Sequence, residues 1–199
     1  MVTADRPMAQ RVGEVIETTS TMFVAQCYQL YGAPPLGAFI RTGSPEVYGI
    51  VYRITTEPLD SSRPVLARGE GMATEEDLYR SNPQIARLLT SRFETLIVGY
   101  CSDGIPRHFL PPLPPRVHSF VYTCIPAEVV QFTAQLDFLH LVVTSGLPVA
   151  DEVAGACLRE ATTAHPERRE FLQRAGKTLA IELASDLSRL NAILRRLTP

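Results

Sequence analysis

Short runs of alternating apolar and polar residues fill much of the chain, and clusters of turn-forming residues separate them. In one run Tyr48, Ile50, Tyr52 and Ile54 fall on the same face at a period of two, which is typical of a half-buried β-strand. Gly, Pro, Ser and Thr between the runs favour turns. The pattern predicts seven strands, at Val12–Glu17, Met22–Gln29, Gly37–Arg41, Val47–Ile54, Phe93–Cys101, His118–Ile125 and Leu136–Val143.

A helical insertion is predicted between the fourth and fifth strands. Thr74 precedes the carboxylates of Glu75–Asp77. This order is typical of a capped helix start, because acidic groups in the first turn interact favourably with the helix dipole. Pro83 interrupts this helix and begins a second short one over residues 84–90, since proline fits a first helical turn. Further prolines keep residues 103–116 extended.

The order of these elements predicts a mainly β fold. Strands and helices do not alternate regularly, so a parallel sheet is not expected and all strands are compatible with antiparallel pairing. We therefore expect a small closed antiparallel β-barrel of six or seven strands with a helical insertion, followed by C-terminal α-helices. The barrel is assigned to residues 11–146 and the C-terminal helical extension to residues 147–199.

The tail of the chain has helical periodicity. One helix is predicted over Asp151–Ala164, and Pro166 begins another. Leucines at steps of three and four then predict a single helix of about thirty residues, on the order of 45 Å long. Its apolar stripe packs either on the barrel and the preceding helix or on another subunit. The candidate interaction residues of this stripe are Leu179, Leu183, Leu187, Leu190 and Leu194.

Charge is distributed unevenly along the 199 residues, whose formal net charge is −2. Residues 165–199 carry +3, which leaves −5 on residues 1–164. The acidic part repels a phosphate backbone. Phe171 is the sole aromatic residue of the tail, so no aromatic residues that could stack on bases are interleaved with its arginines. Nucleic acid is therefore not the favoured partner. The candidate phosphate contacts are Arg168, Arg169, Arg195 and Arg196, because arginine binds phosphate oxygens in a bidentate manner.

The residue patterns indicate a protein without enzymatic chemistry. Gly176-Lys177-Thr178 resembles the end of a phosphate-binding P-loop, but Phe171 stands where that motif needs glycine. Cys101 and His108 show neither metal-ligand spacing nor an activated nucleophile. We therefore expect no catalytic residue, no bound nucleotide, no cofactor and no metal.

The cysteines and the apolar runs indicate the cellular location of the protein. The four cysteines form no CxxC pair, which favours reduced thiols over a zinc site or a disulfide framework. No apolar run approaches the roughly 18 residues of a membrane helix, and residues 1–14 lack the apolar stretch of a secretion signal. We expect a cytoplasmic protein without membrane contact.

Seven short strings follow one another in a recognisable order. They are Gly13-Glu14-Val15-Ile16, Phe23-Val24-Ala25-Gln26, Pro35-Leu36-Gly37, Tyr48-Gly49-Ile50-Val51-Tyr52, Pro83-Gln84-Ile85, Val98-Gly99-Tyr100 and Pro114-Pro115-Arg116-Val117-His118. Together they resemble the HAS barrel, a six-stranded domain shared by the HerA DNA translocases and the catalytic-ring subunits of rotary ATP synthases. The resemblance covers roughly residues 11–146.

The resemblance implies a role in assembly. In those families the barrels of neighbouring subunits pack side by side as a non-catalytic collar, and in HerA the same end meets a nuclease. It implies here a non-enzymatic assembly or protein-interaction module that self-associates as a homo-oligomer or caps a partner complex. The families' ATPase domain has no counterpart in this sequence, so no nucleotide-binding residue is transferred. The alternative is an accessory protein of DNA processing that works with a HerA-like translocase or nuclease.

Overall fold

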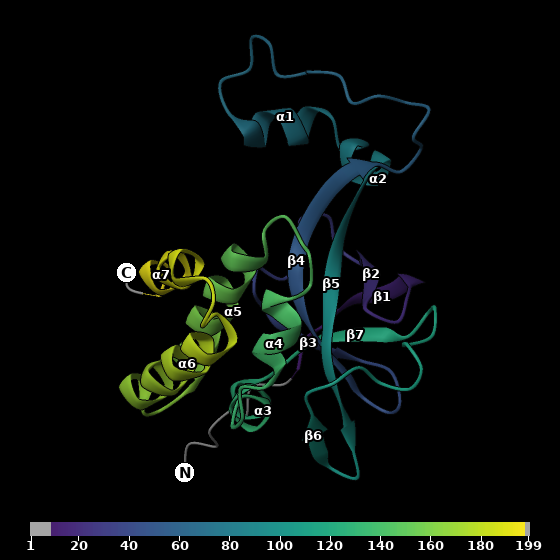
Figure 1. Cartoon of the computed structure of the whole chain (residues 1–199). Coiled ribbons are helices and arrows are strands. Elements are labelled where there is room, and N and C mark those ends of the chain that lie inside the picture. Colours follow the sequence, from purple (N-terminus) through teal and green to yellow (C-terminus); the bar gives the residue numbers. More distant parts are fainter. Residues whose placement is uncertain (1–8, 198–199) are drawn as a thin grey trace, which may run out of the picture.

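Seven antiparallel strands form one sheet in the computed structural model, which describes residues 9–197. They are β1 (Arg11–Thr18), β2 (Met22–Cys27), β3 (Phe39–Thr42), β4 (Val47–Pro58), β5 (Leu89–Ser102), β6 (Ile105–Arg107) and β7 (Phe120–Thr123). Their order in the sheet is β2-β1-β7-β3-β4-β5-β6, and β2 also pairs with β5. Six strands therefore bond in a ring-like way, while β6 extends β5 as an outer hairpin (Figure 1).

Apolar side chains from the six ring-bonded strands meet in one core. Burial alternates along β2 with a period of two, as the sequence pattern predicts, and Phe23 and Ala25 enter this core. Val15, Ile40 and Ile97 join them from β1, β3 and β5, and their side chains are fully buried. The ring-bonded strands are thus held together by a core of their own.

A second core lies between the sheet and the C-terminal helices. Ile50 of β4 and Val98 of β5 are buried there together with Leu158, a helical residue. Both faces of β5 are covered, as the continuous apolar run of this strand predicts. Gly37 marks a close approach, because its φ is +84° and a Cβ at this position would lie 2.5 Å from the backbone of Ala156.

Five helices follow β7 and form the cover of this second core. They are α3 (Pro126–Phe132), α4 (Phe138–Val143), α5 (Ala150–Ala164), α6 (Arg168–Glu182) and α7 (Leu187–Arg195). The helices α4 and α5 contact the sheet, and α6 and α7 pack on α5 (Figure 1). Helix amounts to 33% of residues 9–197 and strand to 27%. The fold is therefore mixed, and the expected mainly β class is wrong.

One predicted strand is replaced by another. The prediction for Leu136–Val143 is wrong, because this segment forms α4, whose four buried residues recur with helical spacing. A short apolar run has no period that distinguishes a strand from a buried helix. The seventh strand is β6, which follows the turn Asp103-Gly104. Both turn residues have positive φ, 53° and 77°, as in a two-residue type I′ hairpin.

The single long C-terminal helix predicted from the leucine stripe is also wrong. The chain forms α6 and α7 instead, separated by residues 183–186. The carboxylate of Asp186 accepts a hydrogen bond of 2.9 Å from the backbone amide of Arg189 and caps the start of α7. Because of this break, the tail can fold back over α5 rather than extend past the sheet.

The strands β4 and β5 continue past the ring as a two-stranded ribbon. Pairing between them extends to Pro58, which lies opposite Leu89, whereas β2 pairs with β5 only from Arg92 to Leu96. We call residues 55–91, which comprise the ribbon and the segment it carries, the arm. Figure 1 shows the arm projecting away from the rest of the molecule.

The arm contains the predicted helical insertion. Its helices are α1 (Glu75–Ser81) and α2 (Ile85–Leu88). The hydroxyl of Thr74 accepts a hydrogen bond of 3.1 Å from the backbone amide of Asp77 and caps α1. This confirms the helix start that was predicted from a threonine followed by three carboxylates.

Candidate functional site

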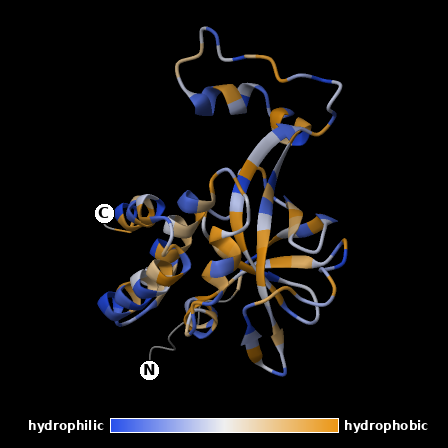
Figure 2. Cartoon of the chain, in the orientation of Figure 1, coloured by the Kyte–Doolittle hydropathy of each residue, from blue (hydrophilic) through white to orange (hydrophobic). Residues whose placement is uncertain are grey.

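The arm exposes large apolar side chains instead of burying them. Neither α1 nor α2 contains a buried residue. Figure 2 shows apolar stretches in the arm's loop and in α2, away from the body of the molecule. The large apolar residues of the arm's loop and helices that are more than a third exposed are Leu59, Val65, Leu66, Met72, Tyr79 and Leu88.

A groove of about 510 Å³ lies among the loop after β4, α1 and α2. Its walls are mostly aliphatic and include Leu66, Leu78 and Ile85. Pockets that bind small ligands or peptide side chains have volumes of about 300–1,000 Å³. The arm therefore offers a concave apolar surface as well as exposed apolar side chains.

Two tyrosines beside this groove form a contact between the arm and the body. The hydroxyls of Tyr31, in the loop after β2, and Tyr79, in α1, lie 2.6 Å apart, and their rings meet edge to face. This hydrogen bond raises the pKa of Tyr79. The backbone amide of Tyr31 also donates to the hydroxyl of Ser91, which lies 3.0 Å from that of Thr56. The base of the arm is thus bonded to the body from one side.

The charged residues that line the groove are mainly basic. They are Arg63, Arg68, Arg87 and Asp60. Arg63 pairs with Asp60 at 3.3 Å. Within residues 9–197, neither Arg68 nor Arg87 forms an ion pair. The apolar surface therefore carries two guanidinium groups without a carboxylate partner. Sequence reasoning missed this site, although the apolar segment Pro64-Val65-Leu66-Ala67 has neither a strand nor a helix period.

The leucine stripe lies in the core of the same chain. Leu179, Leu183 and Leu190 are buried, and Leu194 packs against them from α7. The stripe thus packs on the predicted helix Asp151–Ala164, which was one of the two alternatives. Leu187 is different, because its side chain is 64% exposed at the start of α7.

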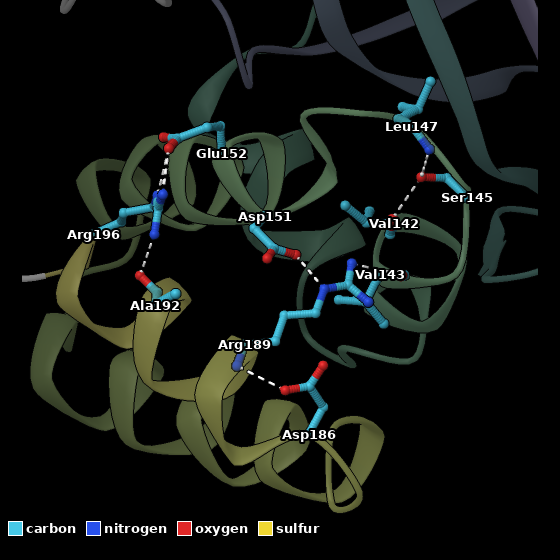
Figure 3. Close-up of polar contacts among 10 residues, drawn as sticks. All are labelled: Val142, Val143, Ser145, Leu147, Asp151, Glu152, Asp186, Arg189, Ala192 and Arg196. Atoms are coloured by element: carbon cyan, nitrogen blue, oxygen red, sulfur yellow. Dashed lines mark hydrogen bonds and ion pairs between the residues drawn. The ribbon is translucent and has the colours of Figure 1, made fainter.

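The junction of α5 and α7 is closed by arginines (Figure 3). The Nε of Arg189 donates to Asp151 at 2.5 Å, and a terminal nitrogen of the same guanidinium donates to the carbonyl of Val143 at 2.8 Å. Arg196 donates from Nε to Glu152 at 2.6 Å, and this bond holds the pKa of Glu152 below its usual value. Both arginines join α7 to α5.

The paired arginines predicted as phosphate contacts fall in different surroundings. Arg168 and Arg169 are exposed at the start of α6, and Arg195 is exposed near the end of α7. Arg196 is engaged by the ion pair with Glu152. Because the tail is two helices, the pairs do not lie along one straight axis.

The residues considered for chemistry occupy structural positions. Gly176-Lys177-Thr178 lies inside α6, where backbone amides bond to carbonyls four residues earlier. Burial raises the pKa of the Cys157 thiol to about 12 and that of Cys27 to about 11, so both thiols are protonated at neutral pH. Among the described residues, no group of three or more His, Cys, Asp or Glu side chains is placed to hold a metal ion.

Neither of two comparisons, with protein families and with curated proteins, gives a relative. A scan against models of protein families finds no match, and a search of the curated proteins finds none. No helix among residues 9–197 is long and apolar enough to cross a membrane. The predicted lack of a secretion signal concerns residues 1–14, of which 1–8 lie outside the described part of the chain.

Proposed function

We propose that this protein is a non-enzymatic module for protein assembly, built on a closed barrel of the HAS type, which self-associates or caps a partner complex through its arm. The observation that carries this proposal is the apolar arm projecting from a body that has cores of its own. The largest exposed apolar patch of a monomer is about 300–600 Å² and is often functional, and larger patches mark interaction surfaces.

The arrangement of the strands supports the barrel. Six strands pair in a ring, and the strings that resemble the HAS barrel fall on or just before strands β1 to β5, helix α2 and strand β7. In the HAS families this domain is a collar between subunits rather than a catalytic unit. We propose the same kind of role here for the ring of strands and the helices that follow it. We place the DNA-processing alternative second, because Arg196 is engaged within the chain.

Removing the tip of the arm tests this function. Pro58 and Leu89 are cross-strand neighbours, so residues 59–88 can be replaced by an Asn-Gly turn that closes the ribbon. Light scattering and cross-linking of the purified chain measure self-association, and reconstitution with each co-purifying protein measures capping. We expect the shortened chain to keep its fold and to lose the assembly.

A matched pair of substitutions controls for nonspecific association through exposed apolar side chains. Leu66→Glu changes an arm residue that is 67% exposed, and Leu113→Glu changes a residue that is 78% exposed beyond β6, outside the arm. We expect only Leu66→Glu to weaken the assembly. A shortened chain that keeps the mass and partners of the full chain overturns it.

A further inference from the structure

We infer that the groove of the arm binds a short segment of a partner protein in which apolar side chains are flanked by Asp or Glu. This inference rests on the proposed function and specifies the chemistry of the partner. It is carried by the combination of an aliphatic groove with guanidinium groups that have no carboxylate partner within the described chain.

The walls of the groove determine the apolar part of the ligand. Leu59, Leu66 and Leu88 line it and are each more than 40% exposed, and Leu78 and Ile85 line it from α1 and α2. Covering such side chains removes apolar surface from water, which favours binding of an apolar segment. A groove of about 510 Å³ holds several side chains of a peptide but not a folded domain.

The charges around the groove determine the rest of the ligand. Three arginines and one aspartate line it, so the lining carries +2 in a chain whose net charge is −2. Arg63 already has Asp60 within 3.3 Å, which leaves Arg68 and Arg87 to meet carboxylates of a partner. A guanidinium forms bidentate bonds with a carboxylate, and it is more weakly hydrated than an ammonium beside apolar surface.

Other features of the arm favour a peptide over a nucleic acid. The rings of Tyr31 and Tyr79 meet each other edge to face and are joined through their hydroxyls. Stacking of successive bases requires open ring faces in series, together with a basic track along the backbone. The walls of the groove are mostly aliphatic and provide no series of open ring faces.

A random library of 12-residue peptides tests the inference without assuming a sequence. The library is selected on the full chain and counter-selected on Leu66→Glu. We expect the enriched peptides to share apolar residues with Asp or Glu beside them. Enrichment of basic or purely apolar peptides, or no enrichment over the counter-selection, overturns the inference.

Charge reversal then tests the two arginines directly. Anisotropy of the best labelled peptide gives its Kd for wild type, for Arg68→Glu/Arg87→Glu, and for Arg168→Glu/Arg169→Glu, an equal charge change at exposed residues of α6. We expect the arm variant to weaken binding about tenfold or more, because it replaces two guanidinium donors by carboxylates that repel the acidic ligand, and the α6 variant to change Kd less than twofold. Equal effects of both variants contradict a site at the arm.

The failure of this inference can be distinguished from the failure of the function on which it rests by comparing the assembly of the shortened chain with the peptides that are selected. If the shortened arm abolishes assembly while the selected peptides lack acidic residues, the function stands and the acidic segment is wrong. If assembly survives without the arm, the function fails as well. A labelled 12-nucleotide DNA strand that binds wild type more tightly than the best peptide assigns the groove to nucleic acid and overturns the inference.

Discussion

The hydroxyls of Tyr31 and Tyr79 lie 2.6 Å apart and connect the loop after β2 with helix α1 of the arm. Both side chains are more than a third exposed, so their hydrogen bond competes with water. The hydrogen bond therefore adds little to the stability of the whole fold, but it connects two parts of the chain that are 48 residues apart. The orientation of α1 relative to the body therefore depends on this contact.

Tyr79→Phe is expected to loosen α1 without destabilising the body. The substitution removes a hydrogen bond whose net contribution is about 0.5–1.5 kcal/mol. Amide hydrogen exchange should become faster in residues 75–81 and stay unchanged in β5. Tyr31→Phe should have the same effect, and the double variant should add little to either single variant. Unchanged exchange in α1 would contradict a role for the hydroxyl pair.

The three leucines at positions 183, 187 and 190 should differ in their contribution to stability. Leu183 and Leu190 are 5% and 8% exposed, whereas Leu187 is 64% exposed. Leu183→Ala and Leu190→Ala should each lower the free energy of unfolding by about 2–5 kcal/mol. Leu187→Ala should change it by less than about 0.5 kcal/mol. Urea titrations followed by circular dichroism measure these changes, and equal effects at all three positions would refute the burial pattern.

Acidification below neutral pH is expected to destabilise the fold through His165. Its ring stacks on Phe171 at 4.1 Å between centroids, and its Nε2 lies 2.7 Å from the hydroxyl of Thr133. Burial lowers the pKa of His165. The folded state therefore binds this proton less readily than the unfolded chain, so stability is full above the ordinary histidine pKa of about 6.5 and falls as the pH drops below it.

Urea midpoints at pH 7.5 and pH 5.5 measure this effect. His165→Gln should reduce the difference between the two midpoints. Part of the difference should remain, because burial also lowers the pKa of His108. The carboxylates of Glu14 and Glu152, whose pKa values are lowered, titrate at more acidic pH and do not contribute in this window. Equal midpoints at both pH values would disprove the contribution of His165.

Binding to duplex DNA is expected to be weak. Arg196 is paired with Glu152, and residues 1–164 carry −5. We expect a Kd above about 10 µM for a 30-base-pair duplex at physiological salt, within the nonspecific range. Anisotropy at three salt concentrations gives the Kd. Submicromolar binding that is lost on replacing all four predicted phosphate-contact arginines by glutamine would make the DNA-processing role the leading one.

The ring-bonded strands were predictable because alternation is a local signal. Every strand of the ring was expected within a few residues, since one buried face imposes a period of two. Asp103-Gly104 is a sequence that favours a two-residue hairpin turn. Residues 103–116 were nevertheless predicted to be extended without a hairpin, because several prolines follow this turn. The break in the tail depends on Asp186, whose capping role competes with an uninterrupted leucine stripe.

The candidate site was not predictable from the sequence to the same degree. The cap of α1 by Thr74 is local and was predicted. Whether the segment that contains Val65 and Leu66 folds back onto the body depends on distant contacts, which no periodicity reveals. The meeting of Tyr31 with Tyr79 likewise depends on the pairing of β2 with β5. The sequence alone therefore predicted the insertion but not its exposure.

The ribbon of the arm also restricts how its length can evolve. Successive side chains along a strand point to opposite faces, so adding one residue to each strand would turn every later side chain over. From Arg53 to Pro58 the pairing of β4 with β5 has no register shift. Residues can therefore be added to the ribbon without moving the later side chains to the opposite face only in pairs on each strand. At about 3.3 Å per residue, the distance from body to tip would change in increments of about 7 Å. Homologues of different reach should therefore fall into discrete length classes.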